Sequence, residues 1–234
     1  MCTRYHLSRE HYREILAALG IAAPDDFDTR YNIAPMSRIP TVRAGPKGPE
    51  AVLCRWGLVP AWARSADGAP LLNARAETAA TKPAFRGALR HRRCVVPASG
   101  YYEWQAIGRA RRPWFFRRRD GAPFGFAGLW ETWRDPAGTI LESCAIITIE
   151  PNDLARPIHD RMPVMLVAEQ FTPWLDPGLT EPASLAPILR PPDDAAMTAL
   201  AVGPHVSNVR HEGPECLAPA PPGTDESQLS LGIG

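Results

Sequence analysis

The second residue of the chain, Cys2, becomes chemically unusual if the initiator Met1 is removed, which a small residue at position 2 usually permits. Removal would leave a free α-amine and a thiol on one residue. Their ordinary pKa values are about 7.7–8.0 and about 8.5, so both groups are partly nucleophilic near neutral pH. Such an aminothiol can condense with an aldehyde to a Schiff base, which the thiol then closes into a thiazolidine ring. Position alone still favours the simpler alternative, a small buried residue.

Three further polar residues occupy otherwise apolar or turn-like segments: Asn73 in LLNARAET, Glu103 in SGYYEW and His159 in RPIHDRMP. Asn73 can orient an amine through its donor and its acceptor, or it can simply cap a turn. Aromatic surroundings raise the pKa of a carboxyl, so Glu103 suits an acid near neutral pH, although an outward-facing strand glutamate is equally compatible. His159 can move protons near pH 7, and a structural histidine beside an ion pair is the alternative.

Arginine and aromatic side chains point to a second kind of chemistry. Of the 26 basic residues only two are lysines, and arginines cluster at residues 86–93 and 109–119. Guanidinium groups bind phosphate, and aromatic faces stack on unpaired bases, so the combination is typical of single-stranded nucleic-acid binding. Most of the rings are expected in the core. Trp62, beside a turn proline and Arg64, is the better exposed candidate, and Trp56 could share the role; a charge run alone is usually only a solvated face.

Composition limits the other classes of function. The 234 residues are 45% hydrophobic and 22% charged, with a net charge of +1, which suits a globular chain and excludes a strongly basic one. There is no apolar run of membrane-spanning length and no signal pattern, so we expect a cytoplasmic protein. The five cysteines include no CxxC pair, and nucleotide-loop and metalloprotease motifs are missing. We therefore expect neither a disulfide framework nor a metal or cofactor.

The elements that must position these residues are mostly short strands. A helix is predicted over residues 8–19 with Ser8 as its N-cap, followed by an ordered loop over residues 20–40. The Asp120-Gly121 pair predicts a hairpin that joins residues 114–118 to 124–129. Further strands are predicted over residues 51–58, 94–97, 101–105, 143–149 and 162–167, and further helical pieces over 78–89 (interrupted near Pro83), 168–174 and 191–200.

Many short strands, few helices and 26 prolines predict an α+β fold, a single compact domain with a bent, barrel-like mixed sheet flanked by short helices. The irregular order of strands and helices argues against a Rossmann-type sheet. The domain is expected over residues 1–212. The Pro-, Gly- and Ser-rich residues 213–234 are expected to form a disordered tail.

Taken together, the segments resemble the SRAP family (SOS response-associated peptidases, or abasic-site processing proteins). The matching pieces follow one another over roughly residues 1–210: MCTRY, YNIAP, WGLVPAW, NARAET, KPAFR, RRCVVPASGYYEW, FAGLWETW and IHDRMPVML. Each piece is modest evidence, and the ordered set is highly specific. Two departures stand out. Thr3 replaces the glycine that usually follows the cysteine, which could crowd the N-terminal turn, and YYEW replaces the commoner FYEW.

The resemblance implies a protein that binds single-stranded DNA and crosslinks to abasic sites, whose ring-opened sugar is an aldehyde. By motif, Cys2 is then the nucleophile after loss of Met1, Asn73 positions its amine or the sugar, Glu103 is the acid/base, and His159 assists proton transfer. The resemblance also implies DNA-contacting residues, with Arg4, Arg75 and Arg161 as phosphate clamps and Trp62 or Trp56 as a stacking surface.

Two other functions remain compatible with these residues. One is a thiol peptidase, perhaps acting only on its own Met1, and the other is a non-enzymatic reader of modified or single-stranded DNA. Lyase activity is a plausible side reaction, because an imine permits β-elimination. We expect a monomer that is nucleoid-associated when bound to DNA.

Overall fold

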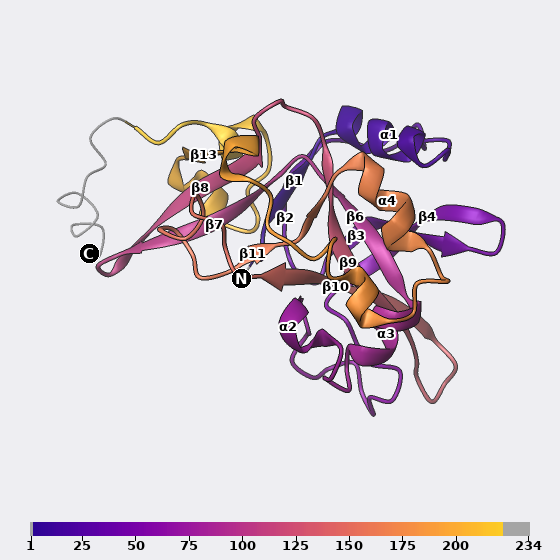
Figure 1. The fold of residues 1–234 in the computed structure, drawn as a ribbon. Helices are drawn as coiled ribbons and strands as arrows, with labels where there is room; N and C mark the ends of the chain where they lie inside the picture. The colour runs from indigo at the N-terminus through magenta and orange to yellow at the C-terminus, as the bar shows by residue number, and fades with distance from the viewer. Residues whose placement is uncertain (1, 222–234) are drawn as a thin grey trace.

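Two β-sheets organise the computed structural model, which describes residues 2–221 (Figure 1). The smaller sheet is antiparallel throughout, and β1 lies inside it with a neighbour on each side. Its strands run in the spatial order β13 (Met197–Ala201), β8 (Ala110–Arg118), β7 (Gly100–Ile107), β1 (Tyr5–Leu7) and β2 (Arg30–Ile33). The N-terminal strand is therefore held from both edges, close to the end of the chain that carries Cys2.

The larger sheet closes into a barrel because its strand order returns to the starting strand. The closed ring runs through β10 (Ile140–Ile149), β4 (Gly48–Trp56), β3 (Arg38–Gly45), β6 (Arg93–Ala98) and β9 (Phe124–Arg134). Three short strands extend it: β5 (Asn73–Arg75), β11 (Met162–Pro163) and β12 (Met165–Leu166). β10 runs parallel to β4 and β5 and antiparallel to β9, so the sheet is mixed. The predicted α+β fold with a barrel-like mixed sheet is confirmed, with the second sheet added to it.

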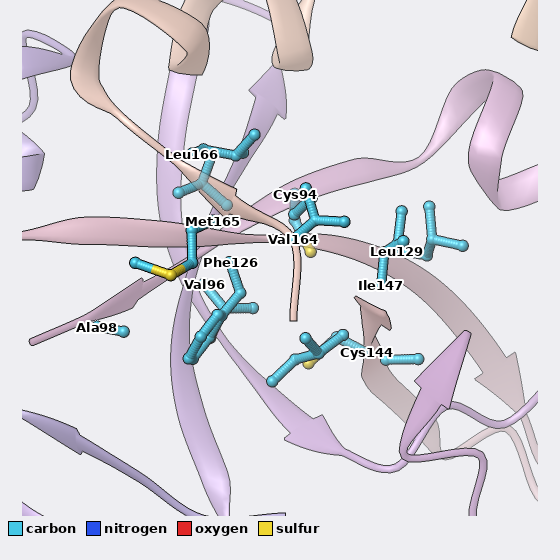
Figure 2. Close-up of a cluster of buried hydrophobic side chains, with 14 of the residues drawn as sticks. Cys94, Val96, Ala98, Phe126, Leu129, Cys144, Ile147, Val164, Met165 and Leu166 are labelled. Atoms are coloured by element: carbon cyan, nitrogen blue, oxygen red, sulfur yellow. The ribbon is translucent and has the colours of Figure 1, made fainter. Parts of the chain in front are cut away.

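The barrel strands carry the hydrophobic core (Figure 2). Val96, Phe126, Leu129, Ile147 and Val164 come from four different segments and are all fully buried. Every residue of β6 is buried, because this strand has the barrel interior on one face while α1 and α4 pack near the other. A strand covered on both faces reads as a continuous apolar run rather than as an alternating one.

Within residues 2–221, four short α-helices flank the sheets: α1 (Arg9–Ala18), α2 (Ala76–Ala79), α3 (Arg86–His91) and α4 (Ala168–Leu175). The Ser8 hydroxyl accepts a hydrogen bond from the His11 N–H at 3.2 Å, which confirms the predicted N-cap of α1. The predicted interruption near Pro83 is confirmed too, since it lies between α2 and α3.

The predicted hairpin around Asp120-Gly121 is wrong. Both strands exist, but β8 pairs with β7 and β13, whereas β9 pairs with β6, β10 and β12. The turn is present, with Gly121 at φ +76°, and it carries the chain from one sheet to the other. The actual hairpin joins β7 to β8 at Gly108, whose φ of +57° suits a tight reversal.

Three other predictions about elements need correction. Residues 20–40 are not wholly a loop, because β2 and the start of β3 lie within them. Residues 191–200 form a short 3₁₀ turn and β13 instead of a helix, since Ala199 and its neighbours pair with β8. The strand predicted over 162–167 is split into β11 and β12, which pair with different partners.

The sequence predicts a tail from residue 213, but residues 213–221 belong to the ordered structure. Residues Pro214–Leu217 form a 3₁₀ helix, and Cys216 is fully buried against Tyr102 and Val206 in a small satellite core. A bridge between Val202 and Pro219 adds the last described segment to this cluster. The apolar contacts of Cys216 thus outweigh the Pro- and Gly-rich composition, and the rest of the predicted tail, residues 222–234, lies outside the described residues.

Candidate active site

Cys2 is positioned by the strand that follows it. β1 pairs with β7 through Tyr5 and Tyr101, and the Tyr102 N–H donates to the Arg4 carbonyl at 3.0 Å. This pairing brings the beginning of the chain alongside the part of β7 that carries Glu103. Cys2 itself is fully buried, with its Sγ 3.9 Å from the Arg4 carbonyl. The residue is thus held in a defined place inside the protein.

Asn73 reaches Cys2 from the other sheet. It opens β5, which pairs in parallel with β10 through Asn73 and Ile146. Its amide Nδ2 donates a hydrogen bond to the Cys2 carbonyl at 3.1 Å. Because side chains alternate along a strand, the exposed Arg75 lies on the same face of β5 as Asn73, with the buried Ala74 between them. β5 therefore carries an amide that fixes Cys2 and, two residues later, the exposed cation of Arg75.

Glu103 is a carboxyl buried in β7, opposite Trp114 of β8, and its exposed fraction is 4%. Burial disfavours the charged form and raises the pKa of Glu103 to about 7, and the charge of Asp160 acts in the same direction. The carboxyl can therefore be either protonated or ionised near neutral pH. This is the property that a group needs if it gives and takes a proton in one reaction cycle.

His159 faces Glu103, with its Nε2 3.8 Å from the carboxylate Oε2. The Arg161 backbone N–H donates to Nδ1 at 3.0 Å, and the Asp160 carboxylate lies 2.9 Å from the same nitrogen. Nδ1 cannot accept from the backbone N–H and donate to the carboxylate at the same time. Because the backbone N–H is always a donor while Asp160 is exposed to water, we assign Nδ1 as an acceptor. The proton of the neutral ring then sits on Nε2, toward Glu103. Burial lowers the pKa of His159, which favours this neutral form.

The Cys2 thiol does not ionise readily in this environment. Its burial raises its pKa well above the ordinary value, and the charge of Glu103 adds to the effect. The thiol therefore stays protonated at neutral pH and must lose its proton during any bond-forming step. Nucleophilic attack is expected to begin at a different group, the α-amine that loss of Met1 would expose.

An open cavity of about 550 Å³ gives access to this cluster. Glu103 and His159 lie in its wall together with Thr3, the position at which a glycine is usual in the resembling family. Thr3 therefore borders the cavity directly. The remaining lining residues are Arg4, Trp104, Arg111 and Ser207.

Two of the three predicted phosphate clamps are engaged in internal contacts. Arg4 is buried, and its guanidinium donates to the Asn32 side-chain oxygen at 2.8 Å and to the Val206 carbonyl at 3.0 Å. Arg161 forms a two-point ion pair with Glu77 at 2.9 and 2.8 Å. Arg75 is the exposed one of the three. Whether Arg4 and Arg161 also contact DNA stays a prediction.

The two predicted stacking residues have opposite environments. The prediction that Trp56 offers a stacking surface is wrong, because this side chain is fully buried. Its indole N–H donates to the Leu72 carbonyl at 3.0 Å, and its ring packs edge-on against Tyr5. It forms core beneath Asn73 instead. Trp62 is 68% exposed, in the loop between β4 and β5, and can meet a base from solution.

Alanine substitution should separate these two tryptophans. Trp56→Ala leaves a large cavity in the core and should lower the free energy of unfolding by about 3–5 kcal/mol. Trp62→Ala should change stability by less than about 0.5 kcal/mol and weaken binding of a single-stranded oligonucleotide about fivefold or more through the loss of one stacking contact. Urea denaturation and fluorescence anisotropy measure the two effects. Equal losses of stability would contradict the assignment.

Sequence reasoning missed two parts of the cavity wall. Arg111 lies in an arginine cluster but was not singled out, because the β7–β8 hairpin at Gly108 that brings it to the cavity wall was not predicted. Ser207 comes from the C-terminal segment, where its hydroxyl accepts from the Trp104 indole at 3.1 Å. The hairpin could have been predicted from Gly108, which lies between two segments of alternating apolar and polar residues. No local sequence feature indicates the position of Ser207.

Two features are absent from the described part of the chain. No group of three or more His, Cys, Asp or Glu side chains gathers there in a way that could hold a metal ion. None of the helices within residues 2–221 has the length and apolar character needed to cross a membrane.

Comparison with known proteins gives consistent matches over nearly the whole chain. The family model of the SOS response associated peptidases matches residues 1–209. The abasic site processing protein YoqW of Bacillus subtilis is 36% identical over 222 residues, which cover 93% of this chain and 99% of YoqW. The abasic site processing protein HMCES of Rattus norvegicus is 31% identical over 237 residues, with coverage of 84% of this chain and 67% of HMCES.

Solved structures agree with the sequence matches. A crystal structure of a protein from Bacteroides thetaiotaomicron superposes with a TM-score of 0.81 at 29% identity, and it covers 93% of this chain and 100% of that one. A protein from Bordetella bronchiseptica gives a TM-score of 0.74, also at 29% identity, over 86% of this chain and 100% of its own. The resemblance of the ordered motifs is thereby confirmed, and the chain belongs to the SRAP family, the SOS response associated peptidases.

Proposed function

We propose that this protein processes abasic sites in single-stranded DNA by forming a covalent thiazolidine adduct through Cys2 after Met1 is removed. The observation that carries the proposal is the convergence of four groups from separate segments. The Asn73 amide holds the Cys2 carbonyl at 3.1 Å, and Glu103 and His159 lie 3.8 Å apart in the wall of the adjoining cavity. Relatives named as abasic site processing proteins, at 31–38% identity, support the choice of an abasic sugar as the electrophile.

The first chemical step uses the α-amine. The neutral amine attacks the aldehyde carbon of the ring-opened sugar, a C–N bond forms, and water leaves as the carbinolamine collapses to a protonated imine, whose nitrogen keeps one hydrogen. Glu103 is near half-protonated at neutral pH, so it can supply the proton that departs with the hydroxyl. Asn73 fixes the backbone of Cys2 during this step, which keeps the amine aimed at the sugar.

The second step closes the ring. The Cys2 sulfur attacks the carbon of the protonated imine, a C–S bond forms, and the thiol proton leaves to a base while the nitrogen keeps its own hydrogen, so no atom is lost. The thiol is protonated at rest because burial raises its pKa. Glu103, ionised once it has given up its proton, can accept the thiol proton, and the Nε2 of His159 can pass a proton to or from this carboxylate across the 3.8 Å gap.

The DNA is held by exposed aromatic and cationic side chains. Trp62 offers an exposed ring, and Arg75 displays a cation on the same face of β5 as Asn73. Single strands fit such a surface, because their bases can stack on an aromatic ring while arginines bind the backbone. Lyase activity is the side reaction that an imine left unclosed would allow.

The decisive experiment incubates the purified protein with a single-stranded oligonucleotide that contains one abasic site and separates the products on a denaturing gel. We expect a shifted band that survives heating, and the same oligonucleotide with an intact base should give none. Mass spectrometry of the starting protein should show that Met1 is missing. Absence of the heat-stable band would leave the thiol peptidase and the non-covalent DNA reader as the functions to test, and retention of Met1 on crosslinking protein would refute the free-amine mechanism.

A further inference from the structure

One cation in the cavity wall is not used by the proposed chemistry. Arg111 lines the same cavity as Glu103 and His159, and its side chain is exposed. It lies on β8 opposite Ala106, three residues beyond the Gly108 turn. The rigid β7–β8 pairing, seven residue pairs long, fixes this arginine relative to the carboxyl on β7.

Arg111 shares a face of the sheet with Trp104. In the ladder, Trp104 pairs with Pro113 and Ala106 with Arg111, so Arg111 is the diagonal neighbour of Trp104 on one face. The Trp104 ring is also approached by Arg4, whose guanidinium carbon is 5.4 Å from the ring centroid. Arg4 and Arg111 therefore both line the cavity that Trp104 also borders.

The guanidinium of Arg111 differs from those of Arg4 and Arg161 in the contacts that it makes. Arg4 is tied to Asn32 and Val206, and Arg161 to Glu77. Within residues 2–221, no carboxylate forms an ion pair with Arg111. The positive charge of Arg111 also helps to lower the pKa of His159, which places it within electrostatic range of the reacting groups.

We propose that Arg111 binds the DNA phosphate next to the abasic sugar and so sets the register of the strand in the cavity. The inference rests on the proposed function, because it assigns a contact to the same DNA. An exposed guanidinium that lines the same cavity as Glu103 and has no ion-pair partner within residues 2–221 is suited to this task, since arginine binds phosphate through two parallel hydrogen bonds. The contact lies close enough to the cavity to hold the flanking linkage while the sugar reaches Cys2.

The test uses the full chain and a single-stranded oligonucleotide that carries a tetrahydrofuran abasic analogue, which has no aldehyde. We expect Arg111→Ala to weaken its binding about tenfold at 0.1 M salt and to reduce the slope of log affinity against log salt by about 0.7, the value for one single-strand phosphate. Arg109→Ala is the matched control, because it removes an arginine from the same hairpin at a position that does not line the cavity. It should weaken binding less than about twofold and leave the slope nearly unchanged.

A substrate change identifies the phosphate. Methylphosphonate linkages, which are neutral, are placed on either side of the abasic analogue in turn. We expect one of them to weaken binding of the unmodified protein about tenfold and to have no further effect on Arg111→Ala. Arg111→Lys should keep the slope of log affinity against log salt and part of the affinity. An unaltered unfolding curve of this variant would exclude a folding defect.

Equal effects of Arg111→Ala and Arg109→Ala, or additive effects of Arg111→Ala and both neutral linkages, would overturn the assignment. Because the analogue cannot crosslink, this result is independent of the denaturing gel. A failed crosslink with an intact Arg111–phosphate coupling would refute the covalent step alone, whereas a normal crosslink without that coupling would refute the Arg111 contact alone.

Discussion

Cys2→Ala is expected to abolish the heat-stable adduct with abasic DNA, lowering its rate of formation by at least about 10³-fold. The variant keeps an α-amine but has no sulfur with which to close a ring. Non-covalent binding of the tetrahydrofuran oligonucleotide should stay nearly unchanged, because Cys2 is fully buried and does not line the cavity surface. The denaturing gel and fluorescence anisotropy measure the two properties on one preparation.

Cys2→Ser separates the two proposed steps. Its amine can still form the imine, but a hydroxyl closes a far less stable ring than a thiol. We therefore expect an adduct that borohydride traps and that heating destroys without it. Cys216→Ala is the matched control, because it removes another fully buried thiol from the satellite core, and it should crosslink normally. A heat-stable adduct from Cys2→Ser would refute ring closure by sulfur.

The candidate catalytic residues could be selected from the sequence because each lies in its own local pattern. Asn73, Glu103 and His159 each stand out as a polar residue in an apolar or turn-like segment, and the family resemblance assigned their roles. The structure places Asn73 against Cys2 and His159 against Glu103. What the pattern could not supply was the long-range pairing of β1 with β7 and of β5 with β10, which joins them.

The candidate DNA-contacting residues were harder to select, because exposure depends on partners that are distant in sequence. Arg161 looks free in the sequence, yet its partner Glu77 lies 84 positions away. Trp56 and Trp62 bracket one short motif, and only the barrel closure decides that the first is core and the second is exposed. Arg111 was overlooked for the same reason, since its place in the cavity depends on which strands β8 joins.

The predicted hairpin at Asp120-Gly121 failed for a related physical reason. A turn sequence specifies a local reversal of direction, and Gly121 does adopt the left-handed conformation. Whether the flanking strands then pair depends on where their apolar faces can be buried. Here β9 fits between β6 and β10 in the barrel, and β8 fits between β7 and β13, so the two strands separate after the turn.

Glu103→Gln is expected to slow adduct formation about 10²-fold or more, because the amide can neither donate an acidic proton nor accept one. In the unmodified protein the rate requires a protonated Glu103, with a pKa of about 7, and a neutral α-amine, with a pKa near 7.7–8.0. The rate should therefore rise with pH as the amine loses its proton and fall above neutrality as Glu103 ionises, which gives a bell-shaped profile. In Glu103→Gln only the rising limb should remain.

The same substitution should affect stability in the opposite direction. The pKa of Glu103 is raised on folding from its ordinary value of 4.5 to about 7, so its contribution to stability is complete below about pH 4.5 and is lost as pH rises through 7. Glutamine carries no charge to desolvate. Above pH 7 the variant should therefore gain up to about 3 kcal/mol in the free energy of unfolding relative to the unmodified protein, with little gain at pH 5. Urea denaturation at the two pH values measures the difference.

If Glu103→Gln makes the protein more stable and less active, the carboxyl at this buried position serves activity rather than stability. Burying an ionisable group costs stability at neutral pH, and a purely structural position would be better served by a neutral side chain. Retention of Glu103 in the cavity wall beside His159 is then explained by the proton transfers that each step of adduct formation needs. If the stability difference is the same at pH 5 and pH 8, Glu103 is not titrating near neutrality, and the proton must come from His159 instead.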